Sequence, residues 1–172
     1  NIKGFKQANM QIKDNQSMVF DGIMATAPTW KDIEFIRKNT KLPLILKGIT
    51  HPSYAKKAIE FGVDGIVVSN HGGRVLDTLV TTMDILPKIV EVVDNKIPIL
   101  LDGGITRGTD ILKALAFGVS AVMIGKPIMY ALATAGALGV AHSLKILKDE
   151  LEIAMALTGC KTLRDINKDI LF

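Results

Sequence analysis

Two segments of this chain repeat one another, and this internal repeat constrains the fold more than any other feature. Residues 41–46 (KLPLIL) match residues 96–101 (KIPILL), and residues 57–63 (KAIEFGV) match residues 113–119 (KALAFGV). The first pair is a short apolar run, typical of a strand that is covered on both faces. The second pair has helical spacing and ends near a glycine, where a left-handed C-cap carries no Cβ penalty. Each copy is therefore predicted to be one strand–helix–strand unit.

The rest of the chain continues this alternation of strand and helix. We predict strands near residues 42–48, 65–70, 97–102 and 121–125. We predict helices near residues 29–39, 52–61, 81–94, 108–117 and 128–158, the last one broken around Gly136 and Gly139. Residues 1–28 show no sustained period and are predicted to be a loop, with Thr29 as the N-cap of the first helix. Such alternation gives a parallel sheet with right-handed crossovers.

The predicted fold class is α/β, about four strand–helix units that form half of a TIM (β/α)8 barrel. A small open sheet is the alternative, but the twofold repeat and the glycine-rich strand ends suit the barrel better. We place residues 29–172 in one domain after the loop of residues 1–28. Half a barrel leaves two strand edges unpaired.

Composition excludes several classes of protein. With 48% hydrophobic and 22% charged residues the chain is globular rather than disordered. Its net charge of +4 comes from scattered cations, so we expect no nucleic-acid surface. Residues 127–144 form the longest stretch without Asp, Glu, Lys or Arg, which falls short of the roughly 20 residues of a membrane span. The single cysteine, Cys160, excludes an intrachain disulfide and indicates a reducing compartment, so we expect a cytoplasmic protein.

Each predicted strand ends in residues that can carry chemistry. They are Lys47 and Gly48, then residues 69–74, then residues 102–104, then Gly125 and Lys126. In a parallel barrel all carboxyl ends of the strands open on one face. The sequence therefore predicts that these residues converge on a single pocket.

The segment after the second strand contains the candidate general base. His71 lies between Asn70 and a glycine pair, an exposed setting in which a histidine suits proton transfer as a general base. Three residues on, Arg74 offers a planar fork that matches a carboxylate. A lone histidine in a turn more often only binds backbone, and we interpret His51 and His142 in that way. Beside Arg74, the functional interpretation of His71 is favoured, with a small acid as substrate.

The third and fourth strand ends predict a phosphate site. Gly103 and Gly104 follow Asp102, and Gly125 with Lys126 repeats the arrangement one strand later. Paired glycines let backbone N–H groups approach a phosphate, and the next helix N-terminus adds positive charge. One such turn is equally typical of a tight turn, but two on neighbouring strands favour a phosphate-bearing ligand. Lys47 faces the same pocket, where it would stabilise negative charge that develops there.

The motif SNHGGR at residues 69–74, followed by Leu76 and Asp77, resembles the FMN-dependent 2-hydroxy acid oxidases and dehydrogenases, which include glycolate oxidase, lactate oxidase and flavocytochrome b2. Residues 42–48, 102–110 and 124–127 support the resemblance, which covers Trp30 to the C-terminus. It implies the C-terminal half of an FMN-binding TIM barrel that lacks its N-terminal half. It also implies oxidation of a small L-2-hydroxy acid of the lactate or glycolate class to the 2-oxo acid, in a homo-oligomer, commonly a tetramer.

The resemblance also implies roles by motif position. His71 would be the base that removes the substrate proton as hydride equivalents pass to the flavin, and Arg74 would bind the substrate carboxylate. Lys47 and Ser69 would lie against the isoalloxazine. The residues expected to hold the ribityl chain and phosphate are Asp102, Gly103, Gly104, Ile105, Thr106, Gly125 and Lys126. We predict no metal ligands.

This chain departs from the family pattern at several positions. Thr106 occupies the place of the first of two usual arginines, which leaves Arg107, and Lys126 replaces another arginine. Val75 stands where glutamine is usual. Two alternatives stay open: a half barrel that binds phosphate or FMN without redox activity, and an FMN-dependent isomerase of a related barrel family. Arg74 argues against an isomerase of isopentenyl diphosphate, since that substrate has no carboxylate.

Overall fold

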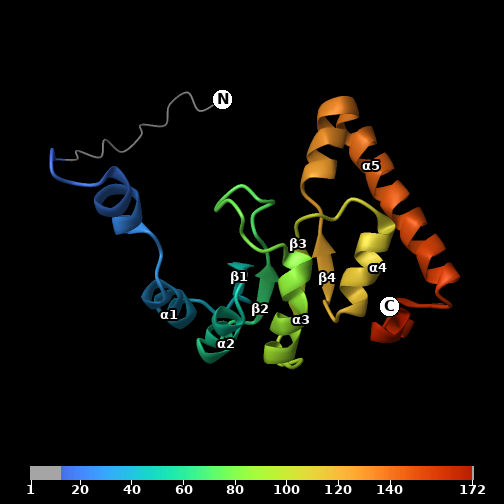
Figure 1. Ribbon diagram of the computed structural model, residues 1–172, viewed down its shortest axis with the longest axis horizontal. Helices are drawn as coiled ribbons and strands as arrows, with labels where there is room; N and C mark the ends of the chain where they lie inside the picture. Colours follow the sequence, from blue (N-terminus) through green and yellow to red (C-terminus); the bar gives the residue numbers. More distant parts are fainter. Residues whose placement is uncertain (1–12, 172) are drawn as a thin grey trace. The chain divides into compact units, whose positions relative to one another are not determined.

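The computed structural model describes residues 13–171, which divide into two units at Thr40 and Lys41 (Figure 1). The first unit contains a π-helical turn η1 (Met18–Ile23), a 3-10 turn η2 (Met24–Thr26) and the helix α1 (Trp30–Asn39). As predicted, Thr29 is the N-cap of α1, and the Asp32 carboxylate accepts from its backbone N–H at 2.6 Å. The contacts of α1 place it in the first unit, and the assignment of residues 29–172 to one domain stays a prediction.

The loop predicted for residues 1–28 is wrong over residues 18–26, which form the two turns η1 and η2. Side chains within a few residues start η1: the Ser17 Oγ accepts from Phe20 N at 3.2 Å, and the Asp21 carboxylate accepts from Ser17 N at 2.7 Å. Such local bonds stabilise a turn without any repeating apolar pattern, so the period search missed it. Residues 1–12 of the predicted loop lie outside the described residues.

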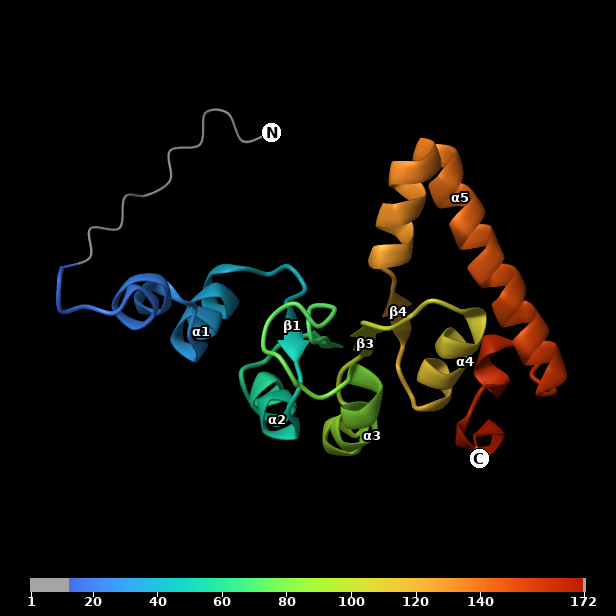
Figure 2. The same ribbon diagram turned by 45° about the horizontal axis from the view of Figure 1, so that its top comes forward.

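The second unit is built on a four-stranded parallel sheet in the order β1-β2-β3-β4. The strands are β1 (Ile45–Ile49), β2 (Gly65–Val68), β3 (Ile99–Asp102) and β4 (Ala121–Met123). Each is followed by a helix: α2 (Pro52–Glu60), α3 (Thr82–Val93), α4 (Gly108–Ala116) and α5 (Lys126–Leu157). Figure 2 shows the strands at the centre with α2, α3 and α4 beside them. The α/β class and the four strand–helix units are confirmed, and chain order equals sheet order, as in an arc of a barrel.

The sequence repeat is also a structural repeat. Gly62 and Gly118, which follow α2 and α4, have φ values of +69° and +100°, so the predicted left-handed ends are confirmed. The next residue of each copy folds back in the same way: Val63 N donates to Ala58 O at 3.2 Å, and Val119 N donates to Ala114 O at 3.4 Å. The matching segments 57–63 and 113–119 thus end their helices in the same way, and the chain then continues into β2 and β4, respectively.

Burial changes across the sheet from the middle to the edges. All four residues of β2 are buried, whereas Ile45 of β1 is 48% exposed and Met123 of β4 is 39% exposed. Within residues 13–171, β1 and β4 each pair with a strand on one side only. The core is made of fully buried apolar side chains from the inner strands and from α3: Ile66, Val68, Leu86, Ile89, Val93 and Leu101.

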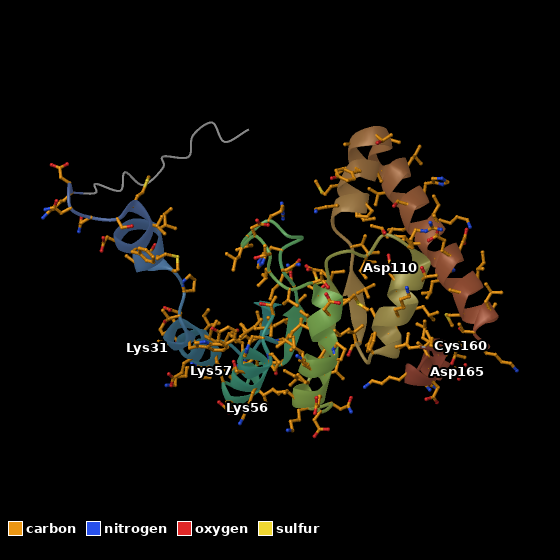
Figure 3. All side chains as sticks on the ribbon, viewed as in Figure 1. Lys31, Lys56, Lys57, Asp110, Cys160 and Asp165 are labelled. Carbon is orange, nitrogen blue, oxygen red and sulfur yellow. The ribbon has the colours of Figure 1, made fainter. Side chains whose placement is uncertain are left out.

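The long helix α5 bends sharply and forms two arms, drawn in orange and red in Figure 1. The bend lies at Ala135 and Gly136, as predicted for Gly136, but Gly139 is helical and does not break the helix. A Cβ at Gly139 would overlap the carbonyl oxygen of Ala131, so this glycine lets the two arms approach each other. The second arm packs against α4 in a cluster of buried residues that includes Leu112, Ala154, Met155 and Cys160, the last of which is labelled in Figure 3.

By length and composition alone, α5 is a candidate membrane span, which is weak evidence for one. The bend at Ala135 and Gly136 divides the helix before its apolar part reaches the length that a bilayer requires. The second arm carries the charged residues Lys145, Lys148, Asp149, Glu150 and Glu152. We therefore interpret α5 as a bent helix of this domain.

Candidate active site

A cavity of about 1080 Å³ opens at the carboxyl ends of the four strands. It is lined by ten of the predicted site residues: Lys47, His71, Arg74, Asp102, Gly103, Gly104, Ile105, Thr106, Gly125 and Lys126. Ser69 is the exception, because its side chain is buried beneath Lys47. The expected convergence of four strand ends on one pocket is therefore present in the structure.

A charged pair lies at the base of this cavity. Lys47 Nζ is 2.7 Å from Asp102 Oδ2 and donates to Ser69 Oγ at 2.8 Å. The two charged residues occupy equivalent positions in the two repeats, on β1 and β3, and alternate strands of a barrel contribute side chains to the same interior layer. Ser69 Oγ also accepts the backbone N–H of His71 at 3.1 Å, which ties the pair to the next loop.

The turn after β2 has an unusual backbone conformation. His71, Gly72 and Gly73 follow one another with φ values of +54°, +71° and +73°. A left-handed conformation costs a residue with a Cβ about 1–2 kcal/mol, so His71 is held there by its surroundings. The imidazole lies against Gly48, where an added Cβ would come within 3.0 Å of His71 Cε1. Glycine at 48 therefore makes room for the ring.

Arg74 is anchored on the same turn as His71. Its Nε donates to the carbonyl oxygen of His71 at 3.0 Å, and the side chain lines the cavity. The guanidinium thus keeps its terminal N–H groups for an acceptor in the cavity. The imidazole of His71 and the guanidinium of Arg74 reach the cavity from one short turn, which fixes their spacing.

The turns after β3 and β4, which were predicted to hold a phosphate, form one end of the cavity. The carboxylate of Asp110, labelled in Figure 3 at the start of α4, accepts the backbone N–H groups of Thr106 and Arg107, both at 2.9 Å. The Arg107 side chain does not line the cavity; it turns to α5 and donates to both carboxylate oxygens of Glu150, at 2.8 and 3.0 Å. Two lysines of this part of the chain line the cavity, Lys113 of α4 and Lys126, and Lys126 Nζ donates to Gly72 O at 3.0 Å.

The Arg107–Glu150 pair stabilises the junction of α4 and α5. The guanidinium and the backbone N–H of Gly108 lower the pKa of Glu150, and Glu150 raises the pKa of Arg107. Gly108 N donates to Glu150 Oε2 at 2.8 Å, and a Cβ at Gly108 would overlap the backbone of Glu150 and Leu151. The Arg107 side chain is thus bound to Glu150, and Thr106, not Arg107, lines the cavity.

Several cavity residues were missed by the sequence analysis. They are Thr81, Thr82, Met83, Asp110, Lys113, Met123, Ile124, Pro127, Met129 and Tyr130. Asn70 lies in the segment 69–74 that was expected at the pocket, and an asparagine two residues before a glycine is typical of an Asx turn. Thr82 had no usable local signal: it is the buried first residue of α3, and its Oγ1 donates to Gly103 O at 3.3 Å. Among the residues that the structure describes, no group of three His, Cys, Asp or Glu could hold a metal ion.

FMN, the cofactor implied by the resemblance, fits two features of this cavity. Asp102 Oδ1 is buried and has no hydrogen-bond partner among the described residues, so it is an acceptor suited to a ribityl hydroxyl. Nothing lies within 4 Å of a Cβ built on Gly104 or Gly125, so a phosphate has open space beside their backbone. These residues, with Lys126, would hold the polyol chain and the phosphate.

Comparisons with known proteins agree with this geometry. A 2-hydroxyacid oxidase of Dictyostelium discoideum is 52% identical over 144 residues, which cover 84% of this chain and 37% of that protein. An L-lactate oxidase of Nostoc sp. is 51% identical over 145 residues, which cover 84% of this chain and 40% of that protein. A crystal structure of mandelate oxidase matches with a TM-score of 0.79 and 45% identity, covering 82% of this chain and 41% of that one.

This chain therefore spans about 40% of the length of the curated relatives that it matches. A solved mandelate oxidase variant with the same TM-score of 0.79 carries a monooxide FMN adduct. The family model described as FMN-dependent dehydrogenase matches residues 3–172, nearly the whole chain. The chain belongs to the FMN-dependent dehydrogenase family, which includes the 2-hydroxy acid oxidases.

Proposed function

We propose that this chain provides the base, the carboxylate clamp and the phosphate loops of an enzyme that oxidises a small L-2-hydroxy acid, of the lactate or glycolate class, to the 2-oxo acid. The observation that carries the proposal is that His71, Arg74, Lys47 and the glycine turns after β3 and β4 line one cavity. FMN, when bound, supplies the acceptor for the electron pair of the substrate. The chain's own residues bind, orient and deprotonate the acid.

His71 and Arg74 act on the two ends of the reacting group. The exposed imidazole of His71 takes the proton of the substrate, a general-base role that histidine fills most often in enzymes. The fork of Arg74 binds the substrate carboxylate with two parallel N–H donors. Because Arg74 Nε is fixed on His71 O, a bound carboxylate is held at a set distance from the base.

Lys47 and Lys126 provide positive charge at two separate places in the cavity. Lys47, held by Asp102 and Ser69, would stabilise negative charge that develops on the reduced ring system. Lys126, Gly104 and Gly125 would bind the phosphate, and the Thr106 hydroxyl, which donates to Asp110 Oδ2 at 3.3 Å in this structure, would turn to it as a further donor. Asp102 Oδ1 would accept from the polyol chain.

Replacing the base tests the proposal. In the full-length protein, His71→Gln keeps a polar side chain of similar reach but cannot accept the proton, so we expect the rate of flavin reduction to fall by about 10²–10⁴-fold. The measurement is flavin absorbance after anaerobic mixing with L-lactate or glycolate. The matched control is His142→Gln, because His142 is exposed on α5 and does not line the cavity. An unchanged reduction rate in His71→Gln would contradict the proposed role.

The two alternative functions predict different results in the same assay. A half barrel without redox activity would bind FMN and show no reduction by any hydroxy acid, while an isomerase would turn over a diphosphate. The position of Arg74 at the cavity favours oxidation of a carboxylate substrate over both alternatives.

The proposal also includes a cytoplasmic homo-oligomer, by resemblance a tetramer. Light scattering of the purified protein measures the number of subunits.

A further inference from the structure

The side chain of Asn70 contacts both ends of the loop that carries His71 and Arg74. Its Oδ1 accepts the backbone N–H of Gly72 at 3.1 Å and that of Gly73 at 3.2 Å. Its Nδ2 donates to the carbonyl oxygen of Val80, where the loop ends, at 3.4 Å. One amide group therefore closes the start of the loop on itself and joins it to the far end.

These hydrogen bonds offset the energetic cost of the left-handed backbone conformation at His71. The left-handed conformation of His71 brings the next two N–H groups to the same side of the chain, where Asn70 Oδ1 accepts both. Without this acceptor, the turn would keep the backbone bond from Gly73 N to Asn70 O at 3.0 Å but lose both side-chain bonds. An asparagine that bonds its own backbone two residues on stabilises a turn in this way.

The same oxygen also lies against the turn after β3. A Cβ built on Gly103 would come within 3.2 Å of Asn70 Oδ1 and 3.3 Å of Thr82 Oγ1. Thr82 is buried and its hydroxyl donates to Gly103 O, so this turn is fixed from the side of α3. Asn70 therefore lies between the turn that carries the base and the glycine turn that we assign to the cofactor.

We propose that Asn70 is a positioning residue, which holds the turn with His71 and Arg74 at a fixed place relative to Gly103. It acts through those two residues and does not touch the reacting atoms. Its role in the reaction rests on the proposed function, but its effect on the turn does not.

Hydrogen exchange of the backbone amides tests the structural part directly. In Asn70→Ala, we expect the amide of Gly72 to exchange about 10- to 30-fold faster, because it loses its side-chain acceptor, and the amide of Gly73 to accelerate less, because it keeps its bond to Asn70 O. Asn70→Asp keeps an acceptor oxygen and should restore the protection. The matched control is Asn167→Ala, since Asn167 Oδ1 also accepts an N–H two residues on, from Asp169 at 2.8 Å, yet does not line the cavity. Unchanged exchange at Gly72 and Gly73 in Asn70→Ala would overturn the proposal.

Kinetics of the full-length protein test the positioning part. We expect Asn70→Ala to lower kcat for the hydroxy acid about 10- to 100-fold. Its melting temperature and its Kd for FMN should stay within the range of the Asn167→Ala control. Asn70→Asp should recover most of the lost kcat. A loss that Asn70→Asp does not rescue, or kcat unchanged despite faster exchange, would overturn a positioning role. If the wild-type protein reduces no flavin, the proposed function fails, and the exchange data alone decide whether Asn70 holds the turn.

Discussion

Replacing Lys47 with methionine should lower the free energy of unfolding by about 2 kcal/mol. An exposed ion pair contributes about 0–1 kcal/mol, whereas removal of one partner from a buried pair costs about 3–5 kcal/mol. The Lys47 and Asp102 side chains are 39% and 16% exposed, which places this pair between the two cases. Methionine keeps most of the length of the lysine stem but leaves the Asp102 carboxylate without its cation, and Asp102 Oδ1 has no other partner among the described residues.

Urea unfolding of Lys47→Met, Asp102→Asn and the double variant gives the energy of the pair itself. We expect the double variant to lose less stability than the sum of the single variants, by about 1–2 kcal/mol. For a domain of this size, a loss of about 2 kcal/mol corresponds to a melting temperature lower by about 4–8 °C. Lys145→Met is the control, because its pair with Asp149 lies exposed within one helix and should change the melting point little. Additive effects of the two single variants would refute the reasoning.

Three further perturbations have definite expected outcomes. Gly108→Ala places a Cβ against the backbone of Glu150 and Leu151, so urea unfolding should show a loss of about 1–3 kcal/mol; a variant as stable as wild type would contradict the close packing of α4 on α5. The pKa of Glu150 is lowered by Arg107 and by the Gly108 N–H, so its contribution to stability is present at neutral pH and lost as the pH falls through that lowered pKa. The difference in melting temperature between wild type and Glu150→Gln should therefore shrink on acidification, and a difference that grows would exclude this linkage. Lys126→Met should raise the Kd for FMN about tenfold in a fluorescence titration and leave riboflavin binding unchanged; equal losses for both would show that Lys126 does not bind the phosphate.

Local sequence pattern was sufficient for the fold and for most of the cavity. Strand and helix order followed from the apolar runs and the repeat, and the convergence of His71, Asp102 and Gly125 followed from the geometry of parallel strand ends. Both predictions used short segments together with one rule, that the carboxyl ends of parallel strands open on the same face. This rule holds even where a strand is shorter than predicted, as β4 is.

Contacts between distant residues could not be predicted in the same way. Arg107 turns to Glu150, which lies 43 residues further along the chain, and Lys126 reaches Gly72 across 54 residues. No local pattern records such partners, so the contacts of Arg107 with Glu150 and of Lys126 with Gly72 could not be predicted. The sequence also did not show which glycine breaks α5. The break lies at Gly136, whereas Gly139 is helical and lies against the carbonyl oxygen of Ala131, which comes from the other arm. The roles of the individual site residues and the cytoplasmic location stay predictions.

The ion pair between the two repeats has a consequence for how this architecture varies. One duplicated backbone position carries a lysine in the first copy and an aspartate in the second, and the two meet over the middle strand. Exchanging the lysine and the aspartate would keep an ion pair with no net charge on the same backbone, with the positive charge on β3 and the negative charge on β1. A tandem duplication of this kind lets two point substitutions redirect the local electric field while strand pairing and helix packing remain unchanged.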